Sequence, residues 1–163
     1  MLKTKVIYSH DPVDDPKRME SAVREALRTA LVYWRRTYAK EHFEPGAVNR
    51  YKYQSRTKLY MLRKARVKKH QKPLVWSGTL RQMVLGQFPQ PRVTRSGSEI
   101  KGHMALRVPT YTYYTKTKSG TPAPPKYDEL VATNDQEADT MAQIVLETID
   151  RVMAKAGIRR KVG

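Results

Sequence analysis

The chain has 163 residues, carries a formal net charge of +17 and contains no cysteine. This length is typical of one domain with a real hydrophobic core, so we expect a single domain over residues 1–163. The missing cysteines exclude disulfides, thiolate zinc sites and cysteine nucleophiles. No apolar run approaches the roughly 20 residues that span a bilayer, and the first residues hold too short an apolar core for a signal peptide. We therefore expect a soluble protein.

The charge is concentrated in the middle of the chain. Between Pro45 and Ser98 there is no Asp or Glu, whereas this stretch holds 13 Lys and Arg residues and therefore 13 of the 17 net charges. Residues 1–44 and 99–163 contribute only +2 each. Both ends thus resemble ordinary protein surface. The middle predicts a negatively charged partner, because so many like charges repel one another when nothing negative lies nearby.

A short strand at Lys5 to Tyr8 is followed by the first strongly predicted helix. Asp15 is a good N-cap, Pro16 suits the first helical position, and the pattern continues to about Glu41, before Pro45. The apolar residues of this helix recur with helical spacing: Met19, Ala22, Val23, Ala26, Leu27, Ala30, Leu31, Trp34 and Tyr38. One face of the helix is therefore expected to be buried.

The apolar pattern weakens over residues 43–73, which we predict to be an extended arm or loop. Residues 50–53 alternate basic and aromatic side chains, as an extended segment does. Ser55 can cap a short helix that runs through Lys69, with Leu59 and Leu62 facing inward.

Two further elements follow the basic region. Ser77 caps a short helix whose Leu80, Met83 and Val84 face one way and which ends at Gly86. Residues 92–108 predict a β-hairpin with its turn at residues 96–98. In its second strand, residues expected to be buried alternate with residues expected to face solvent. The buried set is Ile100, Gly102, Met104, Leu106 and Val108.

The last part of the chain combines a polar loop with a second strong helix. Residues 110–115 can add a strand, and residues 116–126 predict a proline-rich arm or loop. A helix then starts after Thr133 or Asn134 and ends before Gly157, followed by a basic tail at residues 158–163. Its predicted buried face holds Ala138, Met141, Ala142, Val145, Ile149, Val152 and Met153.

Two long amphipathic helices that enclose antiparallel strands predict an α+β fold. In that fold the N-terminal and C-terminal helices pack on a small antiparallel sheet, and long basic loops connect the elements.

The residues that an enzyme would need are poorly arranged. His10 with Asp11, Asp14 and Asp15 could ligate an ion from a loop, but Asp before Pro and at a helix cap already has a structural role. We therefore predict no metal site and no cofactor.

Two other catalytic patterns are incomplete. Glu99 and Lys101 alternate on a strand as in a metal-dependent nuclease, yet the nearest preceding acid is Glu44. No Walker glycine loop occurs, and Ser77 before Gly78 lacks the glycine pattern of a nucleophile elbow, so Ser77 is read as a helix cap. We expect no enzymatic activity.

The basic segment from Arg50 to Pro73 is the main functional candidate. It interleaves Tyr51, Tyr53 and Tyr60 with ten cations, and cations neutralise phosphates while aromatic rings stack on bases. The same charges suit the acidic surface of another protein, because electrostatic complementarity serves both. The predicted partner-binding residues are Arg50, Lys52, Arg56, Lys58, Arg63, Lys64, Arg66, Lys68, Lys69 and Lys72.

The sequence from Phe43 onward resembles the phage virion-morphogenesis and tail-completion proteins. In that family a long N-terminal helix leads through a Phe-x-Pro element and a Tyr/Arg/Lys-rich segment to a signature containing Pro-Leu and Ser/Thr-Gly-x-Leu-Arg. A hairpin and a C-terminal helix then follow. The matching residues here are Phe43, Pro45, Pro73, Leu74, Ser77, Gly78, Leu80 and Arg81. Recognisable residues extend from Phe43 to Val84, and the order of elements matches over about residues 16–156.

This resemblance implies a structural role at the head-tail interface of a virion. The expected partners are the chain's own copies in a ring, with a hexamer as the expected form, the head-tail connector and tail-tube proteins, and DNA in the channel. The protein would reside in the virion neck, and in the host cytoplasm during assembly. Residues 50–72 and 116–126 would be assembly arms.

The competing hypothesis is a free nucleic-acid-binding protein, either architectural or RNA-associated. It predicts that the isolated chain binds duplex or single strands, with an affinity that falls steeply as salt is added.

Overall fold

The computed structural model describes residues 2–7, 16–75, 77–86, 90–106, 108–109 and 126–155. The chain divides into two compact units. The sheet unit is built from residues 2–35, 90–105 and the segment from 135 onward, and the helical unit from residues 36–89 and 106–134. Both units are discontinuous in sequence. The prediction of a single domain stays a prediction.

The sheet unit contains three antiparallel strands: β1 (Leu2–Ile7), β2 (Arg92–Ser96) and β3 (Glu99–Met104). Their order is β1-β3-β2, so the central strand is β3. Ser96 pairs with Glu99, which leaves Gly97 and Ser98 as a two-residue turn. Gly97 has a φ of +58°, a left-handed conformation that glycine adopts without steric cost. The predicted hairpin is therefore confirmed, with β3 ending earlier than expected.

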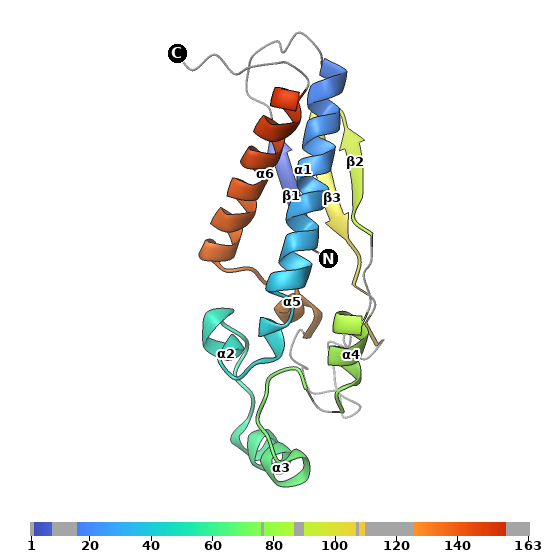
Figure 1. The fold of residues 1–163 in the computed structure, drawn as a ribbon. Coiled ribbons are helices and arrows are strands. Elements are labelled where there is room, and N and C mark those ends of the chain that lie inside the picture. The colour runs from blue at the N-terminus through green and yellow to red at the C-terminus, as the bar shows by residue number, and fades with distance from the viewer. Residues whose placement is uncertain are drawn as a thin grey trace. The chain divides into compact units, whose positions relative to one another are not determined.

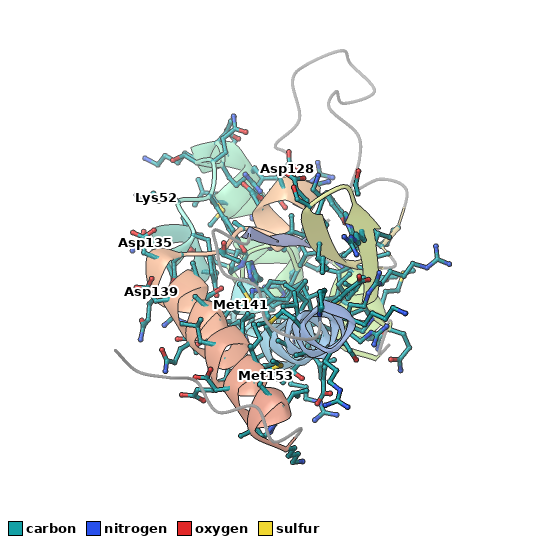
Figure 2. The ribbon with its side chains drawn as sticks, turned by 90° about the horizontal axis from the view of Figure 1, so that it is seen from above. Lys52, Asp128, Asp135, Asp139, Met141 and Met153 are labelled. Atoms are coloured by element: carbon teal, nitrogen blue, oxygen red, sulfur yellow. The ribbon has the colours of Figure 1, made fainter. Side chains whose placement is uncertain are left out.

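Two long helices, α1 (Pro16–Thr37) and α6 (Asp135–Lys155), lie side by side against this sheet (Figures 1 and 2). The predicted apolar face of α1 is buried through its central turns, from Ala22 to Trp34. A Cβ atom added at Gly102 would lie 3.0 Å from Cδ1 of Leu31, so glycine permits the close approach of β3 to α1. The α+β architecture is thereby confirmed.

The C-terminal helix α6 buries fewer of its predicted residues than α1 does. Met141, Val145 and Met153 are buried, and Figure 2 shows Met141 and Met153 on the side of α6 that faces α1. Ala138 and Ala142 are exposed, so the prediction that they are buried was wrong. Their place is taken by Glu137 and Thr148, and Oε2 of Glu137 accepts a hydrogen bond from Nε1 of Trp34 at 3.2 Å.

The helical unit contains short helices. These are η1 (Glu41–Phe43), α2 (Ala47–Arg50), α3 (Lys58–Lys68), α4 (Thr79–Gly86) and α5 (Lys126–Leu130). Within this unit, α3 projects beyond α2 and α4 (Figure 1). Phe43, Leu80 and Val84 belong to its buried core. Residues 43–73, predicted as an arm or loop, thus include helical turns and buried side chains. Their ordering on assembly stays a prediction.

Several expectations concern residues outside the described part of the chain. These are the Asp15 cap, the loop ligands from His10 to Asp15, the strand at 110–115, the arm at 116–125, the stop at Gly157 and the tail at 158–163.

Candidate functional site

The helical unit is organised around a buried histidine. His42 is fully buried, and its Nδ1 lies 3.1 Å from the backbone carbonyl of Glu129 and 2.5 Å from the hydroxyl of Tyr53. A carbonyl only accepts hydrogen bonds, so this contact requires the tautomer with the proton on Nδ1. The His42 ring stacks on the Tyr51 ring, with their centroids 3.9 Å apart. Burial lowers the pKa of His42 to about 4, against the raising effect of the Glu129 carbonyl, so the ring is neutral at pH 7.

Glu129 connects the short helix α5 to the start of the basic region. Its carboxylate is buried, accepts a hydrogen bond from the backbone N–H of Gln54 at 3.0 Å, and binds both terminal nitrogens of Arg56. This two-pronged geometry matches the planar guanidinium fork. Arg56 therefore neutralises a buried acid 73 positions away in the sequence.

Helix α3 begins at a different cap from the one predicted. The Thr57 hydroxyl, rather than that of Ser55, accepts a hydrogen bond from the backbone N–H of Tyr60 at 3.3 Å. The helix ends at Lys68, and the C-cap residue Lys69 has a φ of +58°. Thr57 satisfies one of the N–H groups that a helix start leaves free.

The orientation of α3 is the opposite of the predicted one. Leu59 and Leu62 are 80% and 56% exposed, whereas Lys64 is only 2% exposed. The Lys64 ammonium donates a hydrogen bond to the backbone carbonyl of Lys72 and lies 5.9 Å from the centroid of the Tyr60 ring. The prediction that the leucines face inward was wrong, because the segment at residues 71–74 gives the inner face of α3 a polar partner.

A cleft of about 640 Å³ lies in the helical unit beside α3. Four cations line it: Arg56, Arg63, Lys64 and Lys126. The rest of the wall is mainly apolar, with a few polar groups: Val48, Tyr53, Gln54, Ser55, Tyr60, Met61, Gln71, Pro73, Leu74, Ser77 and Leu80. Such a cleft can accept an apolar group that carries negative charge.

The positive groups around the cleft lie close enough together to affect one another's pKa. Burial and, secondarily, the nearby Arg56 guanidinium lower the pKa of Lys64. The same two effects lower the pKa of Lys126, although Glu129 opposes them. Positive groups therefore raise one another's electrostatic energy here, and an added negative group would relieve that energy.

The ten predicted partner-binding cations fall into two groups. Four of them bind groups of this chain: Arg50 binds Glu41, Arg56 binds Glu129, Lys64 binds the Lys72 carbonyl, and Lys72 binds Glu44 at 3.1 Å. The exposed remainder is Lys52, Lys58, Arg63, Arg66 and Lys69, while Lys68 is half-buried. Lys58, Arg63, Arg66 and Lys69 thus lie on or directly after α3. Whether any of the ten binds a partner stays a prediction.

Most of the predicted signature residues have a role in this fold. Phe43 and Leu80 are buried, and Leu74 packs on the cluster of Ala47, Tyr51 and Tyr53. Gly78 has a φ of +83°, and its carbonyl accepts the first-turn N–H of Gln82 in α4. Pro73 is half-buried, and the other signature side chains, Pro45, Ser77 and Arg81, are exposed.

Ser77 lies two positions before Thr79, the first residue of α4, so Gly78 rather than Ser77 occupies the N-cap position. Its hydroxyl accepts a hydrogen bond from the backbone N–H of Thr79 at 3.4 Å and contacts the Thr79 hydroxyl at 2.8 Å. These contacts are local to the helix start.

Three residues of this site were not predicted from the sequence. The sequence analysis assigned no role to His42 or Glu129, and it placed Lys126 at the end of the loop at residues 116–126. The available signal was the pair of acids, Asp128 and Glu129, which are the first acids after Glu99. The partner of Glu129 is Arg56, which lies 73 positions away in the sequence, so no local pattern indicates the pair.

The nuclease-like pair forms a simple ion pair. Lys101 Nζ lies 2.7 Å from Oε2 of Glu99 on β3. Among the described residues, no group of three or more His, Asp or Glu side chains is placed to hold a metal ion.

Comparison with known proteins returned no matching family model, no matching curated protein and no matching solved structure. In the described part of the chain, no helix is both long and apolar enough to cross a membrane.

Proposed function

We propose that this protein is a structural phage virion component at the head-tail interface, where it joins tail to head as a subunit of a ring. The proposal rests first on the resemblance of residues 43–84 to tail-completion proteins. The structural observation that supports it best is the outer face of α3, where Leu59 and Leu62 are exposed beside Arg63 and Arg66.

An exposed face that mixes leucines with arginines suits a protein partner. Exposed leucine side chains stabilise a complex when they leave water, by about 25 cal/mol per Å² of buried apolar surface. Phosphate backbones offer no apolar surface for them, whereas protein interfaces combine an apolar centre with charged neighbours. In an assembly subunit, both the leucines and the arginines of this face would therefore contact the neighbouring protein.

The tyrosines of the basic segment also favour an assembly role. Tyr51 and Tyr53 are buried and stack with His42 and with each other, at 5.8 Å between the two tyrosine centroids. They are therefore committed to the core rather than available for stacking on bases. Only Tyr60, the third tyrosine of the segment, is substantially exposed.

Removal of the gene from its parent phage or prophage is the decisive experiment. After induced lysis, electron microscopy should show filled heads together with separate or malformed tails. Normal, infectious particles would contradict the proposal.

A variant series then links the role to α3. The R63Q/R66Q variant should block particle completion while the chain still folds. The R28Q/R92Q variant is the matched control, because it removes the same charge from exposed positions in α1 and β2. Equal loss of infectivity in both variants would mean that total charge, and not α3, matters.

Free nucleic-acid binding remains the second candidate, because Lys58, Arg63, Arg66 and Lys69 are exposed together. It predicts sub-micromolar binding of the isolated chain at physiological salt, with a steep salt dependence. Titration of a labelled duplex and a labelled single strand in increasing salt measures this. Weak binding that vanishes near physiological salt is what net charge alone would give.

A further inference from the structure

Helix α3 exposes an apolar and basic face without any acid. Leu59, Leu62, Arg63 and Arg66 follow one another at positions i, i+3, i+4 and i+7, so they share one side of the helix. All four are exposed, and Val67 beside them is 55% exposed. This basic face, defined by these five residues, has the composition of an interface centre that lacks its partner.

Helix α6 exposes an acidic face with an apolar row. Asp139, Ala142 and Leu146 recur at positions i, i+3 and i+7, and all three are exposed. Figure 2 shows Asp135 and Asp139 along the outer edge of α6. Glu147 extends the same side and accepts a hydrogen bond from Gln143. We call Asp135, Asp139, Ala142, Leu146 and Glu147 the acidic face.

We propose that the basic face of α3 in one copy of this chain docks on the acidic face of α6 in a second copy. This inference rests on the proposed function, because a ring subunit needs a contact between two different surfaces of neighbouring copies. The two faces are complementary in charge, and each carries exposed leucine. Two α3 faces would instead place arginine against arginine, which costs free energy.

A contact of this type repeats from copy to copy. A heterologous interface leaves one free α3 face and one free α6 face on every dimer, so growth continues until a ring closes or an open filament forms. The central leucines would supply the apolar burial, and the arginines and carboxylates would fix which surfaces meet. Self-association is therefore expected to weaken as salt is added.

Charge exchange tests the pairing. The R63E/R66E variant and the D139K/E147K variant should each lower the self-association constant at least about ten-fold, as sedimentation velocity would measure it. The R63E/R66E/D139K/E147K chain, which carries both exchanges, should recover most of the wild-type association. Far-UV circular dichroism establishes that each variant folds.

Cross-linking provides a test that does not depend on charge. Because the chain has no cysteine, L62C and L146C introduce the only thiols. A short bismaleimide should link an equimolar mixture of the two single variants into dimers, and the L62C/L146C chain into a ladder of oligomers. Dimers formed by L62C alone, links within one copy only, or no rescue by the fourfold charge exchange would each overturn the proposal.

These measurements use the purified chain and need no virion. If the α3–α6 contact is not found, deletion of the gene can still give unjoined heads and tails. If the contact is found, deletion can still give normal particles. The contact and the virion role can therefore fail separately. A discrete ring mass among the associated species supports the contact, and so does an open ladder.

Discussion

Helices α1 and α3 use similar residues in opposite ways. Each contains two leucines and several basic residues, but α1 buries Leu27 and Leu31 and exposes Arg28, whereas α3 exposes Leu59 and Leu62 and buries Lys64. The leucines of α1 stabilise the chain by leaving water on folding. Those of α3 contribute little to folding and can contribute only when a partner covers them. Composition alone does not say whether a helix serves the core or an interface.

The largest effect is expected from removing a leucine of α1. Leu27→Ala should lower the free energy of unfolding by about 3–5 kcal/mol, because Leu27 is fully buried and a cavity would remain. Urea denaturation with an unchanged m-value measures this. A loss below about 1 kcal/mol would mean that the α1 core is loosely packed.

A buried charge in the helical unit comes next. Glu129→Gln should cost about 3 kcal/mol, because Arg56 would keep its charge and lose its counter-ion. The matched control is Glu44→Gln, whose half-exposed pair with Lys72 should be worth less than about 1 kcal/mol. Equal losses in the two variants would contradict the assigned role of Glu129.

Acid should weaken the fold through His42. Its pKa is about 4 when folded and about 6.5 when unfolded, so between these values the unfolded chain binds the extra proton. The contribution of neutral His42 to the free energy of unfolding is therefore fully present above pH 6.5. It is lost as the pH is lowered towards 4. The expected loss between pH 7 and 4.5 is about 2 kcal/mol.

The difference between wild type and His42→Gln in urea denaturation isolates this effect, because the other titrating groups are shared. If that variant does not fold, an NMR titration of the His42 ring in the wild type measures its pKa directly. A value near 6.5 would contradict the prediction.

The smallest effect is expected on the outer face of α3. Leu59→Ala should change the free energy of unfolding by less than about 0.5 kcal/mol, because its side chain is already in water. Urea denaturation beside Leu27→Ala completes the comparison of the two helices. A loss above about 2 kcal/mol would show that α3 packs its leucines within the folded chain.

Local periodicity was a good guide where one helix face carried the core. The stripe of α1, the hairpin and the short helix α4 with buried Leu80 and Val84 all follow from spacing and turn residues. In α3 the same reasoning found the helix but chose the wrong face. It assumed that leucines turn inward, although their partner need not belong to the same chain.

The α+β class and the two long helices could be predicted from the sequence alone, which also contains the concentration of positive charge between residues 45 and 98. These properties are local or additive, so they need no knowledge of distant contacts. Only the tertiary structure placed Glu129 against Arg56 and His42 beside Tyr53, and only it exposed the leucines of α3. Such pairings depend on chain closure over many residues, which no local pattern encodes.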